Sequence, residues 1–121
     1  MAAVAFPAIV GSRRAQHLKN RSEFAAVYRH GKPFRNQFVV LRALRTERPI
    51  SRIGFTTSRA LGGAVVRNRV KRRLREIVRS VTVAVGWDVV LNARAGCVGA
   101  DYSDMKAGVS GLMRKAGILE K

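Results

Sequence analysis

The stretch VVRNRVKRRLREIVR, residues 65–79, concentrates positive charge on a short part of the chain. Seven cationic side chains fall within the thirteen positions from Arg67 to Arg79, and Glu76 is the only acid between Leu61 and Gly86. Cations at this density neutralise phosphates, and each neutralised phosphate of a nucleic acid releases a bound counterion. The chemistry that this stretch predicts is therefore the binding of a polyanion.

Apolar residues recur through the same stretch at helical spacing, so we expect one helix to carry the cations. With residues about 100° apart, a buried stripe is predicted for Val66, Val70, Leu74, Ile77, Val78 and Val81. Asn68, Arg72, Arg75 and Arg79 fall opposite, Arg69 and Lys71 on the flanks, and Arg67 and Arg73 nearer the stripe. A merely solvated face usually mixes charges of both signs. The lack of such a mixture in this stretch favours a binding surface.

The whole chain is strongly basic and of single-domain size. It has 121 residues, and 24 Lys+Arg against 7 Asp+Glu give a net charge of +17. Nucleic acid is the commonest partner for such a protein, and an anionic membrane is the rival polyanion. The predicted apolar stripe is mostly valine and lacks the large aromatic or leucine anchors of a membrane-surface helix. No apolar stretch approaches the roughly 20 residues needed to span a bilayer. We therefore expect no membrane association.

The elements around the basic helix predict an α+β fold, an α-β sandwich with a small mixed sheet of about four strands. A first helix is expected over 22–30 with Ser22 as N-cap, an antiparallel pair of strands over 36–44 and 51–58, a buried strand within 83–94 and a last helix over 101–117 capped by Asp101. A further short strand near 32–35 is left open. We expect residues 1–15 to form a flexible tail and 16–119 a single RNA-binding domain.

The string GFTTSRALGGAVVRNRVKRRLRE, residues 54–76, resembles the signature of the protein component of bacterial ribonuclease P. The resemblance continues from LKNRSEFAAVYRHGKPFRNQFVVL, residues 18–41, to DVVLNARAG, residues 88–96, and a last helix that opens with DYSDM. It implies a left-handed β-α-β crossover, a sandwich similar to a domain found in a ribosomal protein, and a monomer bound one to one to a catalytic RNA. It also implies that the particle removes the 5′ leader of precursor tRNA, and that the RNA performs the hydrolysis with Mg²⁺.

The resemblance assigns RNA contacts to two groups of residues. The basic helix would bind the ribonuclease P RNA through Arg67, Asn68, Arg69, Lys71, Arg72 and Arg73. Aromatic positions Phe24 and Tyr28 of the first helix would line a cleft for the leader, beside a sheet face that alternation gives to Phe38, Val40 and Arg42. Stacking on aromatic rings tolerates any base, as a varied leader requires. The alternative for Phe24 and Tyr28 is simple packing on the sheet.

Three positions depart from the family pattern, and each affects a single contact. Ala60 stands where a second lysine is usual, Gly63 where asparagine is usual, and Arg42 where an aromatic often faces the cleft. We expect the first to weaken one phosphate contact and the second to loosen the turn before the basic helix. Arg42 would replace stacking by a cation-π or phosphate contact.

The chain itself shows no pattern of a catalyst or of a metal site. His17 and His30 are not placed to share one phosphate, the acids are scattered, and Cys97 is the only cysteine. We therefore expect no catalytic residue and no protein-bound metal, a buried Cys97 thiol and a cytoplasmic protein. The alternative function is a ribosomal or chaperone-like RNA-binding protein without a role in catalysis.

Overall fold

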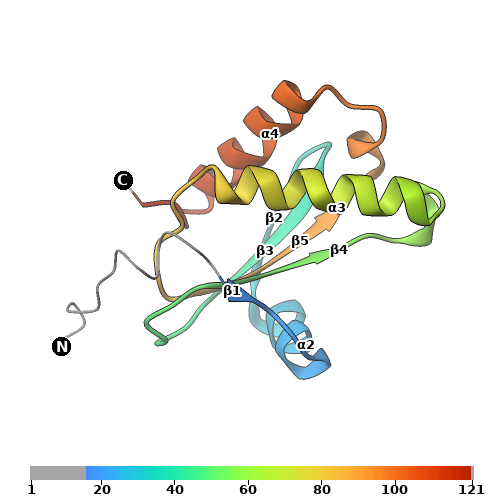
Figure 1. Ribbon diagram of the computed structural model, residues 1–121. Coiled ribbons are helices and arrows are strands. Elements are labelled where there is room, and N and C mark those ends of the chain that lie inside the picture. Colours follow the sequence, from blue (N-terminus) through green and yellow to red (C-terminus); the bar gives the residue numbers. More distant parts are fainter. Residues whose placement is uncertain (1–15, 121) are drawn as a thin grey trace.

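The computed structural model describes residues 16–120 and contains a five-stranded mixed sheet with helices on both faces (Figure 1). The strands are β1 (Gln16–His17), β2 (Lys32–Arg35), β3 (Val39–Arg45), β4 (Arg52–Thr56) and β5 (Trp87–Ala93). The helices are α2 (Arg21–His30), α3 (Ala64–Arg79) and α4 (Tyr102–Lys115), with short 3-10 turns η2 (Arg59–Leu61) and η3 (Ala95–Cys97). The predicted α+β sandwich is confirmed, and residues 1–15 of the predicted tail lie outside the described residues.

Strand β5 occupies the centre of the sheet, whose order is β1-β4-β5-β3-β2. It pairs antiparallel with β3 and parallel with β4, so the predicted direct pairing of the strands at 36–44 and 51–58 is wrong. The reason is burial: every residue of β5 except Trp87 and Asn92 is buried, and the centre of the sheet is the position where both faces of a strand are covered. The unit β4-α3-β5 joins parallel neighbours through the left-handed crossover that the resemblance implies (Figure 1).

The main core lies between the sheet and the pair α3 and α4. Val39, Leu41 and Leu91 from the sheet are fully buried against side chains of both helices, such as Leu74 and Met105. Burying each such side chain stabilises the fold by roughly 1.5–3 kcal/mol. The core therefore fixes α3 with its apolar stripe inward and its cations outward.

Helix α2 packs alone on the opposite face of the sheet (Figure 1), over a smaller cluster made by Leu18, Val27 and Val90. Its N-cap is Asn20 and not Ser22 as predicted, because the Asn20 side chain accepts from the Glu23 N–H while Glu23 reaches back to the Asn20 N–H. This reciprocal capping box satisfies two backbone donors at the start of the helix. The predicted Asp101 cap of α4 is confirmed, since its carboxylate accepts from the Ser103 N–H.

No helix within residues 16–120 is long and apolar enough to cross a membrane.

Candidate nucleic-acid interface

The outer side of α3 is a continuous cationic surface, as the helical spacing predicts. Asn68, Arg69, Arg72, Arg75 and Arg79 are exposed, while Arg67, Lys71 and Arg73 are half-buried. Within the described part of the chain, none of the cations of α3 forms an ion pair with a carboxylate. The charge of this surface is therefore free to act on an external anion.

Two arginines of α3 hold positions set by the fold. Arg73 donates to the Ala100 carbonyl at 3.0 Å, which ties the helix to the segment before α4. Arg67 buries its Nε without a hydrogen-bond partner in residues 16–120. Leaving such a buried donor unpaired costs free energy.

The second candidate surface is the sheet face beside α2. The helix crosses the strands so that Phe24 packs on Gly54 of β4, where an added Cβ would lie 2.5 Å from the ring. One turn later the Arg42 guanidinium of β3 lies 5.3 Å from the centre of the Tyr28 ring, which is 40% exposed. Arg42 thus forms a cation-π contact within the protein, and Tyr28 remains exposed.

Beyond α2 the sheet face is not covered along a row of four neighbouring residues. The register aligns Arg35, Val40, Asn92 and Thr56 across β2, β3, β5 and β4, and all four are at least partly exposed. The Thr56 hydroxyl donates to Asn92 Oδ1 at 2.7 Å. Arg35, Asn92 and Thr56 were missed from the sequence, although a polar Asn92 within an apolar strand is a readable signal.

Phe38 lies on the other side of the sheet, so the prediction that it shares a face with Val40 and Arg42 is wrong. It is 6% exposed and packs against Gly108 of α4 within the main core. The reason is a turn before β3, in which Asn36 Oδ1 accepts the N–H groups of both Phe38 and Val39. Strand alternation begins only after that turn, and Phe38 therefore does not line the cleft.

A buried ion-pair network fixes the start of α2 on the sheet. Arg52 of β4 donates to Asp88 of β5 at 2.7 and 3.0 Å and to Glu23 of α2 at 2.6 Å. The hydrogen bonds that Arg52 donates to the Asp88 carboxylate are the main reason that the pKa of Arg52 is raised. The backbone N–H groups of Lys19 and Asn20, followed by Arg52, lower the pKa of Glu23. These contacts hold the start of α2 against the sheet, and thereby help to position Phe24 and Tyr28 of the same helix.

The remaining chemically reactive side chains lie apart from one another. His17 is in β1 at one edge of the sheet, whereas His30 ends α2 near the opposite edge. The described residues include no group of three His, Cys, Asp or Glu that could hold a metal ion. Cys97 is buried, as predicted, and its burial raises the pKa of the thiol.

Comparison with known proteins gives consistent matches over the same region. The family model described as Ribonuclease P matches residues 13–117. The ribonuclease P protein component of Dehalococcoides mccartyi is 38% identical over 109 residues, which cover 90% of this chain and 91% of that protein. The one from Roseiflexus castenholzii is 37% identical over 111 residues, covering 89% and 91%. The solved RNase P protein from Thermotoga maritima has a TM-score of 0.74 at 26% identity, covering 83% of this chain and 96% of that chain.

Proposed function

The chain belongs to the ribonuclease P protein family, and from this membership we propose how its two surfaces serve the enzyme. As a protein component of ribonuclease P it takes part in tRNA processing. The ribosomal or chaperone-like alternative is not favoured, because the matched relatives are named as ribonuclease P protein components. The proposal concerns which RNA each surface binds.

The cationic side of α3 binds the RNA subunit of the particle. The assigned contacts are Arg67, Asn68, Arg69, Lys71, Arg72 and Arg73, which the fold leaves exposed or half-buried. Arginine suits this task because its planar guanidinium contacts phosphate through two parallel N–H groups. Binding here neutralises phosphates of the RNA subunit, which allows its helices to approach one another.

The cleft beside α2 binds the single-stranded 5′ leader of precursor tRNA. Tyr28 offers a stacking face, Arg42 and Arg35 offer cations, and Val40 offers an apolar floor. Phe24 supports this surface through its packing on Gly54. Stacking and phosphate contacts do not depend on base identity, so the site accepts leaders of varied sequence.

The RNA subunit supplies the catalytic site, with Mg²⁺ bound by the RNA and used to hydrolyse the phosphodiester. The protein acts in the cytoplasm as one subunit per RNA. It binds the RNA subunit, positions the 5′ leader and screens the charge of the phosphates. The observation that carries this division of roles is the pairing of an unneutralised cationic helix with an aromatic cleft on opposite faces of one sheet.

Reconstitution with a bacterial ribonuclease P RNA tests the proposal. The chain should raise cleavage of precursor tRNA at low Mg²⁺, and Tyr28→Ala should weaken binding of the precursor about tenfold while leaving mature tRNA unaffected. Tyr28→Phe retains the ring and should retain the affinity. No stimulation by the wild-type chain would refute the role of the protein, and equal losses for precursor and mature tRNA would assign Tyr28 to folding.

A further inference from the structure

The outer edge of β4 is open along part of its length. Strand β1 covers only Arg52 and Ile53, and the Leu18 N–H donates to the Ile53 carbonyl at 3.2 Å as the last contact of that edge. Because the outward-pointing groups alternate along a strand, the N–H and C=O of Phe55 point to the same edge. No strand within the described residues pairs with them.

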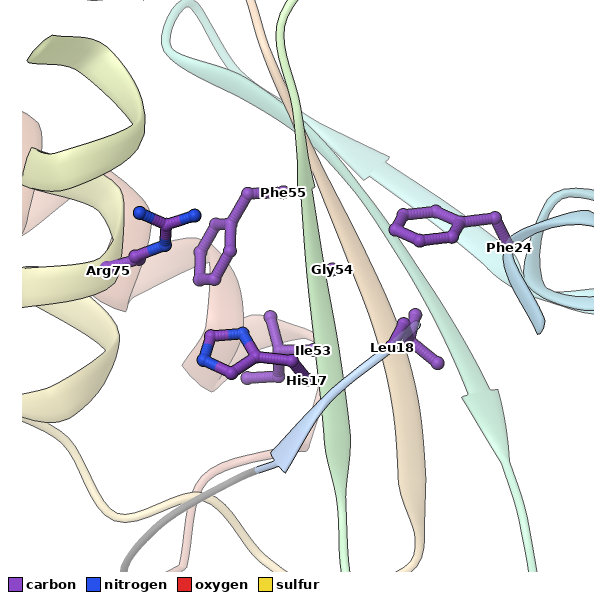
Figure 2. A pocket seen from close by; sticks show the side chains of 7 residues that line it. All are labelled: His17, Leu18, Phe24, Ile53, Gly54, Phe55 and Arg75. Atoms are coloured by element: carbon purple, nitrogen blue, oxygen red, sulfur yellow. The ribbon is translucent and has the colours of Figure 1, made fainter. Parts of the chain in front are cut away.

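A pocket of about 270 Å³ surrounds this edge. Figure 2 shows Phe55 and Arg75 on the α3 side of β4, Leu18 and Phe24 on the α2 side, and His17 at the end of β1. The pocket therefore connects the two faces of the sheet. Its volume suits a small planar group better than a large ligand.

The α3 side of the pocket combines an aromatic ring with cations. The Arg75 guanidinium lies 6.0 Å from the centre of the half-buried Phe55 ring, and the His17 ring is tilted by 57° at 6.3 Å from it. Lys71 and Arg67 lie on the same side of α3 as Arg75, because successive positions are four residues apart. A negatively charged backbone that enters the pocket thus meets a line of positive charge.

The pocket also continues the cleft beside α2. Phe24 lines the pocket and packs on Gly54, and Thr56 of the open row is two residues further along β4. A strand of RNA that lay in the cleft parallel to α2 would cross β4 at this edge, and its next nucleotide would then lie within reach of Phe55 and Arg75.

We propose that this edge pocket holds one unpaired nucleotide of the precursor leader, with the base against Phe55 and His17 and the phosphate on Arg75. The proposal rests on the proposed function, and extends leader binding from the α2 face around the edge of the sheet to the α3 face. The N–H and C=O of Phe55, with which no strand in residues 16–120 pairs, would give the base edge a donor and an acceptor. Stacking of the base against the two rings does not depend on base identity, so the site tolerates varied leaders.

The test uses the holoenzyme and precursors with leaders of increasing length. With wild-type protein, affinity should rise when the leader becomes long enough to pass the cleft and reach β4. Arg75→Gln and Phe55→Leu should each remove about five- to tenfold of that gain and leave affinity for the shortest leaders unchanged. Arg114→Gln, which removes the same charge from exposed α4, should bind every precursor as the wild type does.

Two outcomes would overturn the site. The first is a loss of affinity in Arg75→Gln that is equal at every leader length, or that appears in binding of the RNA subunit alone. Either result would show that Arg75 does not contact the leader. The second is a loss no larger than that of Arg114→Gln. In both outcomes the wild-type chain still stimulates cleavage and Tyr28→Ala still discriminates, so failure of the pocket is distinguishable from failure of the proposed function.

Cross-linking gives an independent readout. A photoreactive uridine placed at successive leader positions should cross-link first to α2 and β3, and then, further from the cleavage site, to residues 53–55 or 75. Cross-links confined to α2 and β3 at every position would refute the pocket. Urea unfolding of Phe55→Leu separates lost contact from lost fold, and Arg75→Gln alters only an exposed side chain.

Discussion

Replacing Arg52 by methionine should destabilise the protein by about 3 kcal/mol at neutral pH. The arginine side chain is 13% exposed and its partner Asp88 is 4% exposed, so the substitution leaves a buried carboxylate without its closest cation. Removing one member of a buried pair costs roughly 3–5 kcal/mol. We expect the lower end, because Arg48 still contacts Asp88 at 3.1 Å.

Urea unfolding measures the effect, and Arg48→Met is the matched control. It removes the same charge from the same carboxylate, but the Arg48 side chain is 47% exposed, and an exposed ion pair contributes at most about 1 kcal/mol. A double variant, Arg52→Met with Asp88→Leu, should recover most of the loss, since an apolar pair of similar volume needs no buried charge.

The reasoning fails if Arg52→Met and Arg48→Met cost the same, because burial would then not set the strength of the network. It also fails if the double variant is less stable than Arg52→Met alone. Since Arg52 also contacts Glu23 of α2, Arg52→Met should in addition reduce the preference of the holoenzyme for precursor over mature tRNA.

Three further predictions concern the helix, the cap and the cleft. Neutralising Arg69 and Arg72 together should lower the slope of log affinity for the RNA subunit against log salt by roughly 1.4–1.8, and an unchanged slope would place both off the interface. Because the folded-state pKa of Glu23 lies below its ordinary value of 4.5, its contribution to stability is present above that pH and is lost as pH falls through the lowered pKa. Glu23→Gln should thus lower the unfolding midpoint at pH 7 and leave it unchanged in strong acid, whereas a deficit that persists in acid would exclude the charge as its cause. Gly54→Ala places a Cβ 2.5 Å from Phe24 and should destabilise the protein by about 1–3 kcal/mol in thermal unfolding; wild-type stability would show that the ring moves freely.

The basic helix could be predicted in detail because its signal is local. The 3.6-residue period fixes which side faces the core, and the exposed Arg72 and half-buried Arg73 follow from it directly. The capping box of α2 was equally local, as Asn20 stands three residues before Glu23. Ser22, the predicted cap, lies inside the helix, where its hydroxyl donates to Asn20 Oδ1 at 2.7 Å.

The order of the strands could not be predicted from local patterns. Strand β5 lies between β3 and β4 although it follows both in sequence, and pairing partners so far apart leave no trace in either strand alone. The residue types place Phe38 on the same face as Val40 and Arg42, but the Asn36 turn interrupts that alternation. The edge pocket could not be predicted for a related reason: its lining comes from four separate segments that only the folded chain brings together.

The central place of β5 also constrains how the chain acquires its structure during synthesis. Translation delivers β3, β4 and the whole of α3 before Trp87, the first residue of the strand that joins them, has been made. Until residue 93 leaves the ribosome, a nascent chain carries a polybasic helix but no continuous sheet on which to pack it. Such non-local closure is slow and exposes apolar surface, so premature termination anywhere before β5 yields a cationic fragment that cannot fold.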